Sequence, residues 1–246
     1  MNLNPKLRFS AIIPAAGCGQ RFGDELPKQY HRLDERAVLE HSMAKLLALP
    51  GLDTLCVVLA ENDPFWSSLT LSTHSKVITA IGGDTRVASV MAGLQALQTH
   101  AAASDWTLIH DAVRPLVAAA QIRHMIDACC SHPVGGVLAM PVADTLKQVN
   151  PELEVVTTID REGIWQIQTP QFFRTEILRK GMALVKQRPA LLPRMTDEAA
   201  VIEALGLPIK VVPNAGINFK ITTRQDLQLA QAYLNLSRTN QVWVTA

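Results

Sequence analysis

The 246-residue chain has almost no excess of charge of either sign, because 23 Lys and Arg residues stand against 22 Asp and Glu, for a formal net charge of +1. Such a balance does not favour bulk electrostatic binding to nucleic acid or to an anionic membrane. No apolar run approaches the ~20 residues that a transmembrane helix needs. We therefore expect neither nucleic acid nor membrane as a partner, and any phosphate must be recognised by local groups.

Cysteine is also scarce: the four cysteines are Cys18, Cys56, Cys129 and Cys130. Their spacing gives no zinc pattern, and the adjacent pair is poorly placed to bridge itself. The first ten residues lack the long apolar stretch of a secretory signal peptide. These features predict reduced thiols in a cytoplasmic protein.

The usual nucleotide-binding signatures are missing. Gly17-x-Gly19 is followed by Gly23, one position late for G-x-G-x-x-G, and no P-loop sequence G-x-x-x-x-G-K-[ST] occurs. An NAD-dependent oxidoreductase is therefore a disfavoured alternative.

The segment that contains these glycines nevertheless predicts a phosphate site. The apolar run at 9–13 is too short for a helix and rich in β-formers, which indicates a buried strand. Arg21 and Lys28 follow it and add two positive charges. The loop between consists mainly of small residues, which let backbone N–H groups approach an anion: Ala15, Ala16, Gly17, Gly19 and Gly23. A tight turn would explain the glycines alone, but the two cations favour binding of a polyphosphate.

Apolar runs and helical periods alternate over the first 140 residues. Strands are predicted at 9–13, 54–59, 76–81, 106–110 and 135–140, and helices at 33–49, 89–97 and 121–130. Nearly continuous apolar strands favour a Rossmann-like, mostly parallel sheet in an α/β fold. Because such sheets bind ligands at the carboxyl ends of their strands, the loops at 15–28, 82–89 and 111–114 should meet at one site.

The alternation breaks at about 142–166, where short alternating runs joined by turn residues predict a β-hairpin arm. A two-stranded ribbon is marginal alone, so the arm should pack on a partner subunit. Later elements are predicted as strands at 209–212 and 217–222 and helices at 174–186, 199–205 and 224–234. We expect one domain over residues 1–235, followed by a C-terminal tail over 236–246 that shows no clear pattern.

A series of motifs carries the chemistry: Pro14-Ala-Ala-Gly-x-Gly-x-Arg-x-Gly, Pro27-Lys-Gln-Tyr, Gly82-Gly-x-x-Arg86-x-x-Ser89-Val, His110-Asp-Ala-x-Arg114-Pro, Asp144-Thr145-x-Lys147, Asp160-Arg161, Thr169-Pro-Gln-Phe-Phe, Thr196-Asp-Glu-Ala and Phe219-Lys220-Ile-Thr. In this order they resemble the 2-C-methyl-D-erythritol 4-phosphate cytidylyltransferase family, whose members join that substrate to CTP in the non-mevalonate isoprenoid pathway. The resemblance implies a fold of the nucleotide-diphospho-sugar transferase type.

The resemblance also implies roles for individual residues. Arg21 and Lys28 would be catalytic, holding the triphosphate and stabilising the transition state. The implied CTP-binding residues are Ala15, Ala16, Gly17, Arg21, Lys28, Gly82, Asp84, Ser89, Asp111 and Ala112. The implied acceptor-binding residues are Thr145, Arg161, Thr169, Thr196 and Lys220. Asp111 would also hold Mg²⁺. In this family Arg161 lies on an exchanged arm and serves the neighbouring subunit's site, which implies a homodimer.

The implied reaction needs no general base, because the attacking phosphate oxygen is already an anion; positioning and electrostatic stabilisation should dominate. His110 is therefore expected to be a packed strand-end residue, and Thr196 alone would be explained as a helix N-cap. Two further alternatives stay open: a cytidylyltransferase for another polyol phosphate such as ribitol 5-phosphate, and a non-catalytic nucleotide-binding module.

Overall fold

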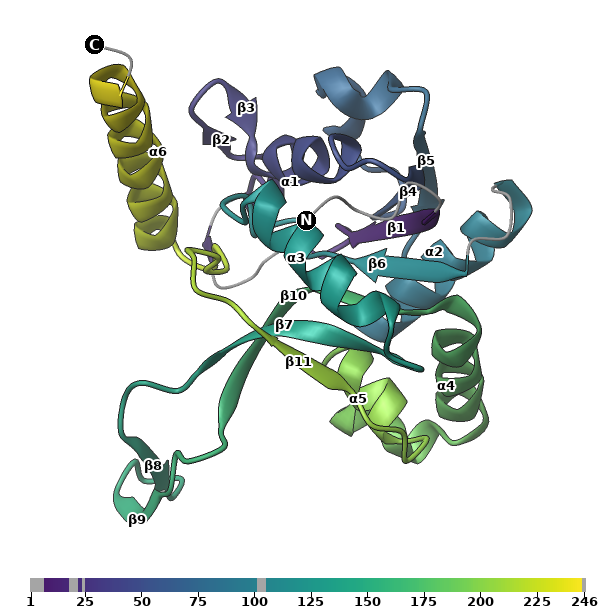
Figure 1. Cartoon of the computed structure of the whole chain (residues 1–246), viewed down its shortest axis with the longest axis vertical. Helices are drawn as coiled ribbons and strands as arrows, with labels where there is room; N and C mark the ends of the chain where they lie inside the picture. Colours follow the sequence, from purple (N-terminus) through teal and green to yellow (C-terminus); the bar gives the residue numbers. More distant parts are fainter. Residues whose placement is uncertain (1–6, 18–21, 24, 101–104, 245–246) are drawn as a thin grey trace.

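The computed structural model describes residues 7–17, 22–23, 25–100 and 105–244, and its centre is one mixed sheet (Figure 1). The strand order is β11-β7-β10-β6-β1-β4-β5. The strands are β1 (Phe9–Pro14), β4 (Leu52–Leu59), β5 (Val77–Ile81), β6 (Trp106–Ile109), β7 (Gly135–Pro141), β10 (Trp165–Arg174) and β11 (Lys210–Pro213). Every neighbouring pair is parallel except those of β10, which runs antiparallel to β6 and β7. The predicted mostly parallel sheet is confirmed.

Strand β10 was not predicted from the sequence. Its segment contains Pro170 and three glutamines, and proline is normally excluded from the interior of a sheet. The register of β10 against β7 shifts between Ile167 and Gln171, so the strand passes Pro170 without a regular ladder on that side. The shift leaves the side chains of Gln168, Thr169 and Gln171 available for contacts outside the sheet.

The α-helices are α1 (Val38–Leu47), α2 (Arg86–His100), α3 (Ala119–Cys130), α4 (Thr175–Gln187), α5 (Glu198–Glu203) and α6 (Arg224–Val244). Short 3-10 turns are η2 (Lys28–Tyr30), η3 (Trp66–Ser68), η4 (Thr70–Thr73) and η5 (Pro189–Arg194). Since none of the helices in these described ranges is both long and apolar enough, the structure offers no candidate for a membrane-crossing helix.

The helices cover both faces of the sheet. Successive strand residues point to opposite faces, so Ala11 and Ile13 of β1 pack in one core with α1 and α3. Ile12 packs in a second core with α2 and α4. The two cores fix the sheet between the helix layers and leave its carboxyl edge free to carry loops.

Two predicted elements differ from the structure. The segment 33–37 is not helical but belongs to a small hairpin of β2 (Arg32–Leu33) and β3 (Arg36–Ala37), with Asp34 at a positive φ of 59° in the turn. The predicted strand at 217–222 is irregular chain, with one backbone hydrogen bond from Ile221 to Val113.

The prediction of a C-terminal tail that begins at residue 236 is wrong, because α6 continues to Val244. The helix is held to the β2–β3 turn, where Arg238 pairs with Asp34 and the Asp34 backbone N–H donates to Gln231 at 2.7 Å. This distant contact stabilises a segment whose own sequence shows no amphipathic pattern.

The predicted hairpin arm is present. Strands β8 (Leu146–Val149) and β9 (Val155–Ile159) pair antiparallel as a separate ribbon that projects from the body (Figure 1). Its cross-strand neighbours include two apolar pairs, Leu146 with Ile159 and Val149 with Val155. Much of this apolar surface is uncovered, since Val155 is 61% exposed and Leu153 is 81% exposed.

Candidate active site

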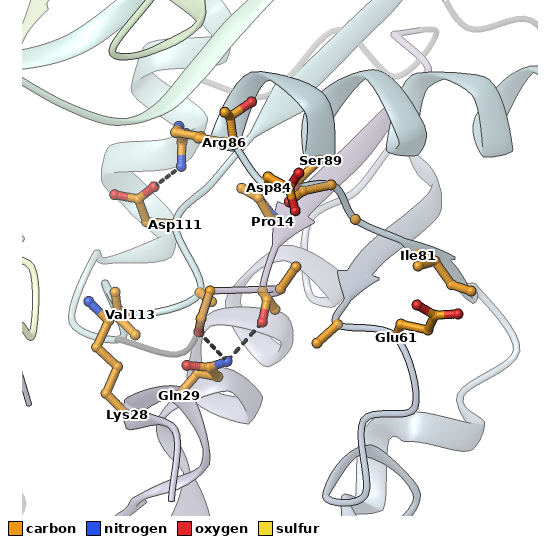
Figure 2. A pocket seen from close by; sticks show the side chains of 18 of the residues that line it. Pro14, Lys28, Gln29, Glu61, Ile81, Asp84, Arg86, Ser89, Asp111 and Val113 are labelled. Carbon is orange, nitrogen blue, oxygen red and sulfur yellow. Dashed lines mark hydrogen bonds and ion pairs between the residues drawn. The ribbon is translucent and has the colours of Figure 1, made fainter. Parts of the chain in front are cut away.

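A cavity of about 530 Å³ opens at the carboxyl edge of the sheet (Figure 2). The three loops predicted to meet, at 15–28, 82–89 and 111–114, all contribute to its wall. The lining includes Ala15, Ala16, Gly17, Lys28, Gly82, Asp84, Ser89, Asp111, Ala112 and Lys220. The described residues of the implied CTP site are therefore brought together in one cavity. Arg21 lies outside the described residues.

The first loop is held from behind by Gln29, which is almost fully buried. Its side-chain amide donates to the carbonyl oxygens of Ala15 at 2.8 Å and Gly17 at 3.1 Å (Figure 2). Two fixed carbonyls constrain the orientation of the peptide groups between them. Gln29 therefore sets the shape of the loop, while its neighbour Lys28 lines the cavity.

The second loop can approach the first only because position 82 is a glycine. A Cβ atom on Gly82 would lie 2.6 Å from the Cβ of Ala16 and 2.7 Å from the Oγ of Ser89. Both contacts are far inside van der Waals range, so any side chain would force the loops apart. Gly82 thus brings the start of α2 against the β1 loop.

Asp111, just beyond β6, is the centre of the charge arrangement. Its Oδ1 pairs with Arg86 (Figure 2), and its Oδ2 lies 3.1 Å from the Lys220 ammonium and 3.2 Å from Nε of Arg114. Burial alone would raise the pKa of Asp111, but the charges of Arg86, Lys220 and Arg114 hold that pKa well below its usual range. The carboxylate stays ionised with three cations around it.

Arg86 bridges two buried acids, because its second nitrogen lies 2.8 Å from Glu198 Oε2. Glu198 is fully buried, and within the described part of the chain its Oε1 has no hydrogen-bond partner. Burial raises the pKa of Glu198, while the Arg86 charge opposes that rise. Burial likewise disfavours the Arg86 cation, yet its pKa is raised because Glu198 and Asp111 outweigh that cost.

His110 is a packed strand-end residue, as predicted. Burial lowers its pKa to about 4, so the ring is neutral at pH 7. Its Nε2 lies 3.1 Å from the carbonyl of Arg114, which makes Nε2 the protonated nitrogen and Nδ1 an acceptor. The Thr169 hydroxyl donates to Nδ1 at 3.1 Å and accepts from the Asp111 N–H at 2.9 Å. His110 therefore orients Thr169 and is no proton carrier.

A second cavity, of about 330 Å³, shares Arg86, Asp111 and Lys220 with the first. Thr169 and Thr196 line it as well, so three of the five implied acceptor residues meet here. A third hollow of about 420 Å³ continues past Arg114 and Lys220. The positive side chains of Arg86 and Lys220 therefore lie at the junction of the first and second cavities.

Thr145 and Arg161 are not part of these cavities. Both are exposed on the arm, and the Arg161 guanidinium donates to the carbonyl of Ala143 at the arm's base. Their role depends on what packs against the arm.

The alternative explanation of Thr196 as an N-cap is wrong. Asp197 caps α5, because its Oδ1 accepts from the N–H of Ala200 at 2.9 Å. Gln171 of β10 fixes this turn, donating to Asp197 at 2.9 Å and accepting from the Ala199 N–H at 3.0 Å. Thr196 is left exposed at the cavity wall.

Sequence reasoning gave no role to the residues that position this site. They are Gln29, Arg86, Arg114, Gln171, Glu198 and Asn218. The side-chain amide of Asn218, which is almost fully buried, donates to the backbone carbonyl of Thr169 at 2.8 Å, and the backbone carbonyl of Asn218 accepts from Arg114 at 2.6 Å. Several of these residues stand inside the motifs, but a lone amide or charge there is as typical of a solvated surface as of a buried contact.

Residues 9–236 match the protein family described as 2-C-methyl-D-erythritol 4-phosphate cytidylyltransferase. The chain is 42% identical to the enzyme of that name from Vibrio parahaemolyticus, over 93% of this chain and 96% of that protein. It is 45% identical to the one from Dechloromonas aromatica, over 92% and 97%.

Solved structures agree with these matches. The crystal structure of the Francisella tularensis enzyme of the same name superposes with a TM-score of 0.78 at 33% identity, covering 91% of this chain and 98% of that one. A 4-diphosphocytidyl-2C-methyl-D-erythritol synthase superposes with a TM-score of 0.79 at 32% identity, covering 93% and 99%. The sheet, the cavities and these likenesses agree, and the chain belongs to the 2-C-methyl-D-erythritol 4-phosphate cytidylyltransferase family.

Proposed function

We propose that this protein transfers the cytidylyl group of CTP to 2-C-methyl-D-erythritol 4-phosphate, giving 4-diphosphocytidyl-2-C-methyl-D-erythritol and pyrophosphate. The observation that carries the proposal is the position of Arg86, Asp111 and Lys220, which line both the larger and the smaller cavity. A transfer between two phosphates requires cations at the junction of two binding sites, and family membership supplies the two substrates.

CTP occupies the larger cavity in this proposal. The backbone of the loop at 15–17 and the segment from Gly82 to Ser89 receive the nucleotide. Lys28 reaches the triphosphate as a compact point charge, and Arg21 adds a planar fork of donors. Both residues are proposed as catalytic.

The acceptor occupies the smaller cavity, with its phosphate toward Lys220 and its polyol toward Thr169 and Thr196. A phosphate oxygen of the acceptor attacks the α-phosphorus of CTP in line. The new P–O bond forms as the bond from the α-phosphorus to the leaving pyrophosphate breaks, and no proton needs to be removed. The cations offset the repulsion between two anions and the charge that gathers on the α-phosphoryl oxygens.

Thr145 and Arg161 complete the acceptor site from a second copy of the chain. Both lie on an arm whose apolar residues are exposed, and a ribbon of this size needs a packing partner. An exchanged arm in a homodimer buries that surface and brings Arg161 to the neighbouring acceptor cavity.

Mg²⁺ is the proposed metal, with Asp111 as its protein ligand. Within the described ranges, no group of three or more His, Cys, Asp and Glu side chains could hold a metal. One carboxylate fits this ion, which takes most of its ligands from substrate phosphates and water. Both Asp111 oxygens are engaged by cations, so one of these pairs must open first. The bound ion would neutralise phosphate charge during transfer.

We also propose a cytoplasmic location. Cys56, Cys129 and Cys130 are free thiols in the structure, which fits a reducing compartment.

The test is pyrophosphate release by purified protein with Mg²⁺ and CTP. Methylerythritol phosphate, ribitol 5-phosphate and a sugar 1-phosphate are offered as separate acceptors. We expect rapid release with methylerythritol phosphate alone. Release with ribitol 5-phosphate instead would overturn the acceptor, and CTP binding without release from any acceptor would overturn catalysis.

A further inference from the structure

We infer that Glu198 is a positioning residue for catalysis: through its ion pair with Arg86 it clamps the acceptor half of the site against the nucleotide half. The inference rests on the proposed function and assigns a task to a buried carboxylate that lines neither cavity.

The two partners start helices that carry different sides of the site, although the Arg86 side chain itself lines both cavities. Arg86 is the first residue of α2 and directly follows the loop that packs on the β1 loop. Glu198 is the first residue of α5 and follows Thr196, which lines the acceptor cavity. Their 2.8 Å ion pair joins segments that lie 112 residues apart in the sequence. It is therefore a direct mechanical link between the two binding halves.

The same pair also fixes Asp111. Arg86 uses one terminal nitrogen for Asp111 and the other for Glu198, so the planar guanidinium is held at both ends. Without Glu198, Arg86 keeps only the Asp111 carboxylate, and its guanidinium can rotate about that one contact. The expected consequence is a loss of alignment between the α-phosphorus and the attacking oxygen, since a displacement of about 1 Å can cost ~10²-fold in rate.

A glutamine could replace most of what Glu198 contributes to the fold. Its Oε1 is buried without a partner in the described part of the chain, and an ionised carboxylate held by a single ion pair is costly to bury. The α5 start has independent anchors in the Asp197 cap and in Gln171 of β10. Glutamine keeps the shape of Glu198 and an oxygen that can accept from Arg86, so Glu198→Gln should still fold, with a lower stability because Arg86 loses one of its two buried counter-charges.

This combination separates a positioning role from a structural one. For Glu198→Gln we expect a lower Tm but a folded protein at the assay temperature, a kcat about 10-fold lower, and KM values for CTP and acceptor within about twofold of wild type. Glu198→Ala should lower kcat by about 100-fold. The matched control is Glu203→Gln, which removes an exposed charge from the same helix and should leave kcat unchanged.

Wild-type kcat in Glu198→Gln would overturn the inference, as would a rise in KM alone or a loss of kcat that disappears when the rate is calculated for the folded fraction only. Amide hydrogen exchange without substrates provides a readout independent of turnover. We expect faster exchange at the starts of both α2 and α5 in Glu198→Gln than in wild type, and equal exchange would also overturn the clamp. Failure of the wild-type protein to release pyrophosphate would instead overturn the proposed function.

Discussion

The carboxylate of Asp111 illustrates how single residues here depend on neighbours that are distant in sequence. Three cations reach it from α2, from its own loop and from the chain before α6. Each cation is visible in the sequence, and the loops that carry Arg86 and Asp111 could be placed at one sheet edge. Their pairing could not be predicted, because it depends on side-chain reach across elements 25 and 109 residues apart.

Replacing Lys28 by alanine should lower kcat by about 10²-fold, the scale of losing one preorganised group that stabilises transition-state charge. The measurement is steady-state pyrophosphate release with both substrates saturating. Lys186→Ala, which removes an exposed lysine on α4, serves as control and should keep full activity. Near-normal turnover of Lys28→Ala would remove Lys28 from the catalytic residues.

Gln29→Glu should weaken nucleotide binding with little effect on the acceptor. The carboxylate cannot donate to the carbonyls of Ala15 and Gly17 and would repel both, at a cost of about 1–3 kcal/mol. We expect the Kd for CTP, measured by calorimetry, to rise at least about tenfold. Gln95→Glu on the exposed face of α2 is the control. Equal CTP affinity in the two variants would contradict the bracing role of Gln29.

His110 should make stability depend on pH. Burial lowers its pKa from 6.5 to about 4, so the unfolded chain binds a proton that the folded chain refuses. The contribution is therefore full above pH 6.5 and is lost as pH falls toward about 4. We expect a fall in urea midpoint between pH 7 and pH 5 that is smaller in His110→Gln. Glu198, whose pKa is raised, makes stability change with pH in the opposite direction, but it does so equally in both proteins. The comparison of wild type with His110→Gln therefore removes the contribution of Glu198.

At the scale of elements, the sequence predicted helices and strands correctly where apolar residues recur at a regular period. Strands β1, β4, β5, β6, β7 and β11 were all predicted within a few residues. The predictions failed where tertiary contact decides the conformation. Strand β10 carries Pro170 and polar side chains that bond to loops, and α6 continues through a segment that gains its partner from the Asp34 turn.

A charge on the arm should disrupt its packing. Val155→Asp places a carboxylate on the exposed apolar surface of β9. We expect sedimentation to show a dimer for the wild-type protein and a monomer for the variant. Leu229→Asp is the matched control, because Leu229 is similarly exposed but lies on α6. A wild-type sedimentation coefficient for Val155→Asp would mean that the arm does not form the interface.

At the scale of the whole molecule, one chain does not bring the five implied acceptor residues together. The body gathers Thr169, Thr196 and Lys220, while Thr145 and Arg161 stand on the arm. The arm was predictable from its alternating pattern. No pattern in a single chain could show which body the arm serves.

Complementation tests this division directly. Lys28→Ala and Arg161→Ala proteins should each have little activity. When the two variants are mixed by refolding or co-expression, about half of the dimers should contain one copy of each variant. Each such dimer has an intact body and an intact arm at one of its two sites, so activity should recover to about a quarter of wild type. Activity of the mixture that stays at the sum of the separate variants would show that each site takes its arm residues from its own chain.

The central position of β10 also has a consequence for the order of synthesis. Strands β6 and β7 precede the arm in the chain, yet they do not pair with each other, because β10 lies between them. Until residues 165–174 have left the ribosome, both strands have an open edge of unpaired peptide groups. The nascent chain therefore completes its arm before its main sheet, and chains that stall at the arm should be the ones that aggregate or recruit chaperones.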